Sequence, residues 1–268
     1  MKNLLIISQL LAIACSAQVA VNIAPGIPIF GPPGSAFAAE LPPGVSEPTA
    51  DILWLKWNDG SGTVSTADVG PNAYATGGGW TTGADTVAKH AFNGGGDTTS
   101  YTGTTGSPDN VTYEVNVITV CFWAYNSAWG TGNTTLFNSS TDSSKANTWW
   151  IYNDEGTVTF IMQGTTVGNY KQSTVTAPSN NAWHHFAVVF DASTETGTTT
   201  IYIDGVAQSV NTVTDTKDGT SNFADQPLYM LSRNGSATTF WGGYLDDTRI
   251  YASALSAGQV AAVYANPE

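Results

Sequence analysis

The amino-acid sequence predicts an all-β protein that folds as a large antiparallel sandwich, and its patterning and composition support this. Residues 183–190 alternate two sets of apolar and aromatic side chains, which is the period of a strand covered on both faces. The chain contains 28 Gly, and its short apolar runs recur at spacings of roughly ten residues, as a fold with many turns requires. A length of 268 residues suits one large sandwich better than two ordinary domains.

The first fifty residues differ in composition from the rest. No charged residue occurs from 3 to 39, and Lys2 precedes an apolar run over 4–14, so residues 1–17 have the parts of a secretory signal. This run is too short to span a membrane comfortably. Residues 18–50 hold most of the 12 Pro, which predicts an extended linker. Their isoleucines and phenylalanines favour a second interpretation, an arm that lies along another protein surface.

Several later segments have the patterns of strands, and one has the pattern of a helix. After a polar turn, the run 199–204 follows 183–190 and stops at Asp204-Gly205, a reverse-turn signal, so we expect these two runs to pair as antiparallel strands. Residues 117–125 form another apolar run. Helical periodicity is confined to 256–265, where Ser256 is a suitable cap for a short helix.

Several of these motifs resemble a known family. Trp183-His184-His185, the turn 202–205 (YIDG), the segment 243–251 (GYLDDTRIY) and the closing 254–256 (ALS) are similar to the pattern of laminin-G-like, concanavalin-A-like domains. The resemblance extends over roughly residues 51–265. It implies a two-sheet antiparallel β-sandwich, or jelly roll, with one short C-terminal helix, formed by residues 51–268. A fold of this kind does not by itself imply a ligand.

The net charge of the chain makes some classes of binding partner unfavourable. Eight Lys and Arg against 21 Asp and Glu give a net charge of −13. Nucleic acid and anionic lipid surfaces would therefore be repelled, and nucleic acid is not an expected partner. The excess of acid also favours solubility and discourages edge-to-edge pairing of strands.

The residues that could carry chemistry give little support to catalysis. Polysaccharide hydrolases of this general shape place two carboxylates on alternate residues of one strand, so that both face the cleft. The adjacent acids at 154–155 and at 246–247 would instead point to opposite faces of a strand. The histidines at 184–185 belong to the family's strand pattern, which implies that one is a hydrogen-bonded core residue. Cys121 lies in an apolar run and is interpreted as a small buried hydrophobe. We therefore expect no enzyme.

A calcium ion is a further expectation, because laminin-G-like sandwiches commonly hold one. By resemblance, the candidate ligands are Asp68, in a loop that ends at Gly70, and Asp246 or Asp247 at the start of a strand. Carboxylate oxygens are the ligands that calcium prefers. The structural alternative is that Asp68 shapes its own turn and that one of the aspartate pair forms a salt bridge with Arg249.

Exposed aromatic residues are the candidates for ligand binding, since sugar rings stack on flat apolar faces. Trp80, Trp129 and Trp241 all lie in Gly-rich or polar surroundings. The structural alternative is that these rings cover the end of the core. At 149–150, two tryptophans open a strand, so one is expected to face inward and the other outward.

Taken together, these observations predict a non-catalytic recognition module of a secreted or cell-surface protein. It would bind glycan or protein through loops at one end of the sandwich, with calcium as a structural ion. The alternative is a structural subunit of a phage or virus particle, such as a capsid decoration or tail protein. In that alternative, residues 18–50 would tie each subunit of the virion to its neighbours.

Overall fold

The computed structural model describes residues 45–59, 61, 64–76, 79–82, 90–93, 101–103, 110–129, 132–140, 145–233, 239 and 241–268, without the side chains between 75 and 103. The predicted signal segment and the linker up to residue 44 lie outside the described residues. Within these residues, no helix has the length and hydrophobicity that a membrane span requires.

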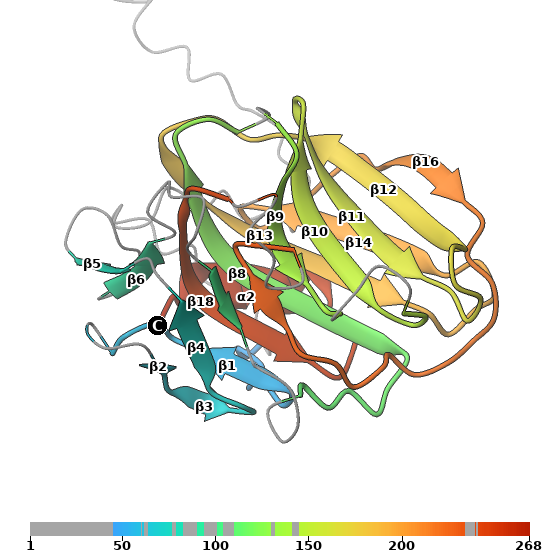
Figure 1. Ribbon diagram of the computed structural model, residues 1–268, viewed down its shortest axis with the longest axis horizontal. Helices are drawn as coiled ribbons and strands as arrows, with labels where there is room; N and C mark the ends of the chain where they lie inside the picture. Colours follow the sequence, from blue (N-terminus) through green and yellow to red (C-terminus); the bar gives the residue numbers. More distant parts are fainter. Residues whose placement is uncertain are drawn as a thin grey trace, which may run out of the picture.

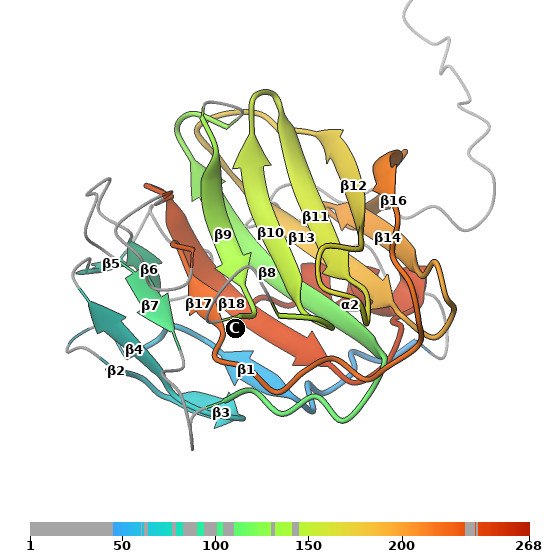
Figure 2. The ribbon, with the colours of Figure 1, turned by 45° about the vertical axis from the view of Figure 1, so that its right-hand side comes forward.

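Two antiparallel sheets form the domain, as the sequence predicts (Figure 1). In spatial order, sheet A contains β15 (Val206–Ala207), β14 (Thr198–Ile203), β13 (Ala182–Asp191), β8 (Val117–Asn126), β18 (Tyr244–Tyr251), β1 (Leu53–Leu55) and β3 (Ala67–Val69), with β6 (His90–Asn93) beside β18 and β5 (Gly79–Thr82) beside β6. Sheet B contains β16 (Asn211–Asp215), β12 (Tyr170–Thr176), β11 (Thr157–Gln163), β10 (Trp149–Asp154), β9 (Thr134–Asn138), β17 (Tyr229–Met230), β7 (Tyr101–Gly103), β4 (Ala73–Thr76) and β2 (Val64–Ser65). The layer of β9 to β12 lies across the layer of β8, β13 and β14 (Figure 2).

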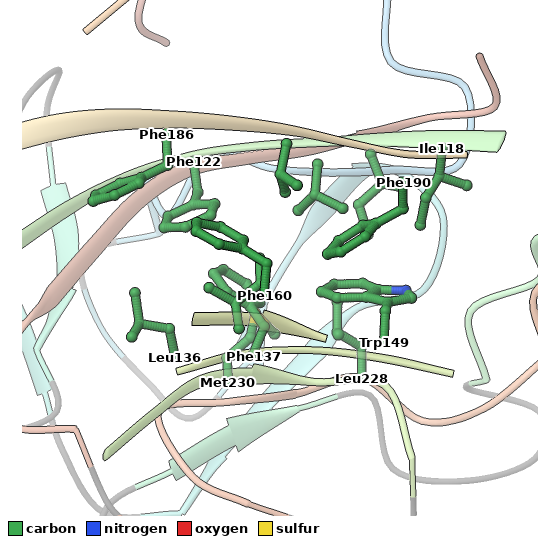
Figure 3. Packing of buried hydrophobic residues seen from close by; sticks show 14 of the residues in the cluster. Ile118, Phe122, Leu136, Phe137, Trp149, Phe160, Phe186, Phe190, Leu228 and Met230 are labelled. Carbon is green, nitrogen blue, oxygen red and sulfur yellow. The ribbon is translucent and has the colours of Figure 1, made fainter. Parts of the chain in front are cut away.

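An aromatic core fills the space between the sheets (Figure 3). Phe122 of β8 stacks on Phe186 of β13, with ring centroids 5.2 Å apart, and contacts Phe137 of the opposite sheet at 4.7 Å. Trp149 of β10 packs against Phe190 of β13 in the same way, at 5.7 Å. Each buried aromatic side chain contributes roughly 1.5–3 kcal/mol to folding, so this core accounts for a large part of the stability of the sandwich.

The strand pair predicted from residues 183–204 is confirmed. β13 and β14 pair antiparallel, with Phe186 opposite Ile203. The turn that follows has positive φ at both Asp204 (51°) and Gly205 (76°), as a tight hairpin turn requires, and Ile203 then pairs with Val206. The Asp-Gly signal therefore marks the hairpin between β14 and β15.

A second, smaller cluster covers the outer face of sheet A. Helix α2 (Ala257–Ala265) begins at Ser256, whose side chain and that of Gln259 form a capping box. The helix places Tyr264 on Trp123 of β8, with ring centroids 5.3 Å apart. Cys121 lies buried in the same cluster and forms no disulfide. The sequence predicts that the strand of residues 183–190, now β13, is covered on both faces and that a short helix follows near the C-terminus. Both predictions are confirmed.

Strand β18 changes partner at a bulge. Its first residues pair with β6, and its last residues, from Thr248 onward, pair with β1. The register against β8 shifts between Asp246 and Arg249, and Asp247 has φ 41°. A bulge changes the directions in which the neighbouring side chains point. The polar side chains of β18 near the bulge therefore do not follow the alternation of a regular strand.

The end of the predicted linker packs on the sandwich. Ala50 is buried in the cluster under α2, and Glu47 forms an ion pair with Arg249. The sandwich in the structure therefore includes residues from position 45 onward, some of which the sequence pattern assigned to the linker.

Candidate ligand-binding face

The outer face of sheet B carries aromatic and polar side chains that are only partly buried. Along β10, Trp149 and Ile151 point into the core, whereas Trp150 and Tyr152 alternate with them and are half-buried. Trp150 pairs with Asn138 of β9 and with Ile161 of β11. The period of a strand therefore sets these side chains on one face, and the expectation that one of the two tryptophans faces outward is met.

A pocket of about 110 Å³ opens on this face. Its walls come from β9, β10, β11 and the segment after β17, and they consist of Asn133, Thr135, Asn138, Trp150, Tyr152, Ile161 and Arg233. Sites for drug-sized ligands usually occupy ~300–1,000 Å³. This pocket is smaller than that range, so it would receive only part of a ligand, such as one edge of a sugar ring or one side chain.

Arg233 closes one side of the pocket. Its guanidinium lies over the Trp150 ring, with Cζ 4.6 Å from the ring centroid. The Nε of Arg233 and the Nε1 of Trp150 are buried and have no hydrogen-bond partner among the described residues. Buried donors without partners are unfavourable, and a ligand could reach these two only after the side chains around them shift.

Tyr152 presents a neutral hydroxyl at the pocket. Burial raises the pKa of Tyr152 above its usual value, so the phenol keeps its proton at physiological pH. The Gln172 amide of β12 donates a hydrogen bond to the Tyr152 hydroxyl at 3.4 Å. The pocket therefore combines aromatic, amide, hydroxyl and guanidinium groups, a set suited to recognising a polar ring.

Two of the tryptophans predicted to bind ligand are core residues instead. Trp129 is 5% exposed and Trp241 is 1% exposed. Their rings pack against each other with centroids 5.4 Å apart, and Trp129 also contacts Phe186. Glycine-rich surroundings suggested exposure, but these rings cover one part of the core. Trp80 lies in β5, opposite Phe92, and its side chain lies outside the described part of the structure.

The predicted metal ligands have protein partners. Asp68 forms a salt bridge with Lys56 at 2.8 Å. Asp246 accepts a hydrogen bond from the Asp247 backbone N–H at 2.9 Å, and Asp247 binds Arg249. Among the described residues, no group of three or more His, Cys, Asp and Glu side chains could hold a metal ion. The structural alternative for Asp247, a salt bridge with Arg249, is therefore the one observed.

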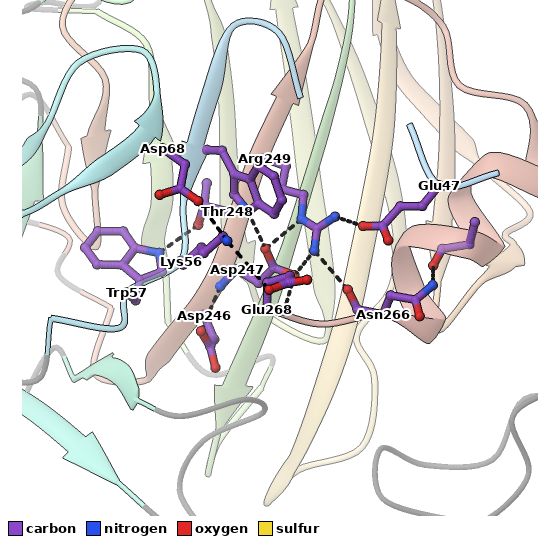
Figure 4. Close-up of polar contacts among 12 residues, drawn as sticks. Glu47, Lys56, Trp57, Asp68, Asp246, Asp247, Thr248, Arg249, Asn266 and Glu268 are labelled. Atoms are coloured by element: carbon purple, nitrogen blue, oxygen red, sulfur yellow. Dashed lines mark hydrogen bonds and ion pairs between the residues drawn. The ribbon is translucent and has the colours of Figure 1, made fainter. Parts of the chain in front are cut away.

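Arg249 organises a buried polar network on β18 (Figure 4). Besides Asp247, its guanidinium donates to the Asn266 carbonyl at 2.9 Å and forms an ion pair with Glu47. It also lies over the Trp54 ring, 4.5 Å from the centroid. Burial acts to lower the pKa of Arg249, but Asp247 more than offsets this and raises it. The network joins β18 to the C-terminal end of α2 and to the segment before β1, so its role is structural.

The two adjacent histidines of β13 have different environments. His184 is the hydrogen-bonded one: Nδ1 lies 2.7 Å from Asp204 Oδ2, and Nε2 lies 3.0 Å from Ser179 Oγ. His185 is the buried one, and neither of its ring nitrogens has a hydrogen-bond partner within the described residues. His184, whose side chain is 12% exposed, is therefore the closer match to the expected hydrogen-bonded core residue, and the alternation of the strand gives the two histidines different environments.

Ser179, His184 and Asp204 have the order of contacts found in a catalytic triad. However, His184 Nε2 also lies 3.1 Å from the Ser179 backbone carbonyl oxygen. An Nε2–H that donates to this carbonyl cannot accept the serine proton. Asp204 also accepts the His185 backbone N–H at 2.9 Å, at the hairpin turn. These contacts favour a structural role, in which His184 joins the segment at Ser179 to the hairpin turn at Asp204.

The buried thiol agrees with its predicted role. Cys121 is fully buried in sheet A, and burial raises its pKa well above the usual value for a thiol. A thiol with a raised pKa carries little thiolate, which is the reactive form. Cys121 therefore packs as a small hydrophobe.

Comparisons with known proteins agree with this fold. The family model Laminin_G_3, described as the concanavalin A-like lectin/glucanases superfamily, matches residues 98–261, more than half of the chain. The chain therefore belongs to this family, as the sequence motifs indicated. No curated protein matches the chain.

Among solved structures, the similar ones include receptor-binding domains of botulinum neurotoxins. The domain of mosaic serotype C/D is 17% identical, with a TM-score of 0.58, and the match covers 80% of this chain and 50% of that one. For serotype G the identity is 14% and the TM-score 0.58, with 81% and 50% covered. This chain therefore spans about half the length of these structures, and the likeness concerns the fold.

Proposed function

We propose that this protein is a non-catalytic recognition module that binds glycan through the outer face of sheet B. The observation that carries the proposal is the pocket where Arg233 stacks on Trp150. Trp150 and Tyr152 offer flat apolar faces for a sugar ring. Asn133 and Thr135 in the pocket lining offer amide and hydroxyl groups that can fix the sugar hydroxyls.

The proposed site lies on the sheet rather than on the loops that the sequence suggested. The reason is that Trp129 and Trp241 are buried in the core, whereas Trp150 and Tyr152 remain partly accessible. Backbone pairing with β9 and β11 holds β10 in place. A site on such strands is better fixed than one on a loop.

A glycan array tests this proposal. The wild-type protein is expected to bind at least one class of glycan, and Trp150→Ala is expected to lose that binding. Trp183→Ala is a suitable control, because Trp183 is a half-buried tryptophan on β13 of sheet A, away from the pocket. Silence of the folded wild-type protein across the array would overturn the proposal, and so would equal loss of binding in both variants.

Structural calcium stays a prediction from the family resemblance, with Asp68, Asp246 and Asp247 as its candidate ligands. Titration of the protein with calcium in a calorimeter tests it directly. Running the glycan array with and without chelator then shows whether a metal takes part in binding.

Secretion or display at the cell surface is part of the same proposal and rests on the signal-like composition of residues 1–17. The alternative function, a decoration or tail subunit of a virion, is favoured by exposed apolar side chains at the edges of the described sheets. Val206 on β15 and Val213 on β16 are 54% and 55% exposed, on the outermost strands of sheets A and B. Exposed edge strands are potential pairing surfaces.

The intact mass of the protein from its native source separates the two functions. Loss of about the first seventeen residues supports export. Retention of Met1, or removal of the methionine alone, supports assembly inside a cell.

A further inference from the structure

We propose that the ligand of the Trp150 pocket is an acidic glycan, in which the carboxylate of a uronic or sialic acid residue binds Arg233. This inference rests on the proposed function and adds the chemical class of the sugar. It follows from the charges of the residues around the pocket, and from the position of Arg233 and its lack of a carboxylate partner among the described residues.

Arg233 differs from the other basic side chains whose contacts the structure describes. Lys56 pairs with Asp68, Lys171 with Asp215, and Arg249 with Asp247. Lys217 donates three hydrogen bonds to backbone carbonyls. Arg233 and Lys145 have no ion pair with any carboxylate of the described residues, and of these two only Arg233 lines the pocket. In a chain with 21 acidic residues against eight basic ones, a guanidinium without such a partner at a pocket wall is a notable exception.

The position of Arg233 leaves it able to bind an anion. One face of its guanidinium lies on the Trp150 ring, which orients the group and restricts its motion. Its Nε is buried and has no hydrogen-bond partner within the described residues. A guanidinium carries five N–H donors in a planar fork, which matches the two oxygens of a carboxylate. A carboxylate bound at the terminal nitrogens would give Arg233 the anionic partner that the described residues do not supply.

The surroundings of the pocket are compatible with a negatively charged sugar. The residues that line it are neutral except for Arg233. The nearest acidic side chain along β10 is Asp154, two residues beyond Tyr152 on the same face of the strand. The separation between residues two apart on a strand is roughly 6.5–7 Å. Asp154 therefore lies toward the Tyr152 end, so the carboxylate of the sugar is expected at the Trp150 end.

The sugar ring then has a defined place. With its carboxylate on Arg233, the ring lies against Trp150 and Ile161, and its hydroxyls face Asn133 and Thr135. The pocket volume of about 110 Å³ is small for a whole sugar residue, so the pocket would receive the carboxylate and the adjacent edge of the ring. The rest of the glycan would continue across the outer face of sheet B.

The test compares acidic sugars with their neutral counterparts in a calorimetric titration. One pair is trigalacturonate and its carboxyl-reduced form, and the other is sialyllactose and lactose. In at least one pair, the acidic sugar is expected to bind at least about tenfold more tightly, since hydrogen bonds between charged groups are stronger than those between neutral ones. Arg233→Gln is expected to reduce this preference to within about twofold, and Lys56→Gln, with the same change of charge on sheet A, is expected to keep it.

The outcomes separate this inference from the proposed function. If neutral sugars bind as tightly as acidic ones and Trp150→Ala abolishes their binding, the acidic ligand is wrong and the recognition module stands. An acidic preference that survives in Arg233→Gln also overturns the assignment of the carboxylate to Arg233. If neither pair binds and the wider glycan array is also silent, both proposals fail.

Discussion

Arg249 binds Asp247 through two parallel hydrogen bonds, Nε to Oδ1 and Nη2 to Oδ2, both 2.7 Å long. The side chains of both residues are 1% exposed. The two residues are neighbours on β18, at the bulge where the strand changes partner from β6 to β1. Because this guanidinium and carboxylate are paired and buried, they fix the conformation of the strand at the bulge.

Removing one partner of this pair is expected to be costly. Asp247→Ala leaves a buried guanidinium with less counter-charge, and the loss of a buried partner typically lowers the free energy of unfolding by about 3–5 kcal/mol. Asp68→Ala is the control, because the Lys56–Asp68 side chains are 29% and 48% exposed. An exposed pair is worth at most about 1 kcal/mol. Urea denaturation measures both, and equal losses would contradict the structural role of the network.

His185 is expected to make the protein sensitive to acid. Burial, and then the charge of Arg249, lower the pKa of His185 from 6.5 to about 3. Between these two values the unfolded chain binds a proton that the folded chain does not. The free energy of unfolding therefore falls as the pH drops through this window, with a contribution approaching ~1.4 kcal/mol per pH unit.

The variant His185→Phe removes this contribution. It is expected to unfold with a shallower dependence on pH than the wild type, and its stability at neutral pH should not fall, because two ring nitrogens without partners are replaced by carbon. Denaturant titrations at several pH values test this. Identical pH dependence in both proteins would show that His185 does not control acid sensitivity.

The tryptophans are expected to divide into two functional groups. Trp241→Ala removes a ring that is 1% exposed and packed on Trp129. Such truncations cost about 3–5 kcal/mol, while ligand binding by the folded protein should persist. Trp150→Ala should cost less stability and abolish binding. Thermal melts and glycan titrations of both variants check this, and loss of binding in a folded Trp241 variant would place the site elsewhere.

The contacts between Ser179, His184 and Asp204 are expected to stabilise the fold rather than catalyse a reaction. Asp204→Ala removes the acceptor of two hydrogen bonds and should cost about 1–3 kcal/mol. Ser179→Ala should cost less than about 1 kcal/mol, since the carbonyl contact with His184 remains. A serine-directed fluorophosphonate should not label the protein. Labelling that disappears in Ser179→Ala would contradict the non-catalytic proposal.

The strands could be predicted because their signals are local. The alternation from 183 to 190 and the Asp204-Gly205 turn each occupy a short stretch, and β13, β14 and the hairpin follow them. Ser256 could be predicted as the capping residue of α2 for the same reason. Since each pattern is set by the backbone period of its own element, no distant residue had to be known.

The pocket could not be predicted because it joins distant parts of the chain. Trp150 could be assigned an outward direction from the strand period, but nothing near it in sequence indicates Arg233, which follows β17. The burial of Trp129 and Trp241 was missed for a related reason. Their glycine-rich and polar neighbours describe the local loops, whereas the rings pack on residues such as Phe186 far along the chain.

The central claim, that sugars bind at Trp150 on the outer face of sheet B, is tested most directly by nuclear magnetic resonance of the tryptophan indoles. Addition of the best-binding glycan is predicted to shift the indole Nε1–H signal of Trp150, assigned through Trp150→Phe, and to leave those of Trp129 and Trp241 in place. A shift confined to other tryptophans, with the Trp150 signal unchanged at saturation, would contradict the claim.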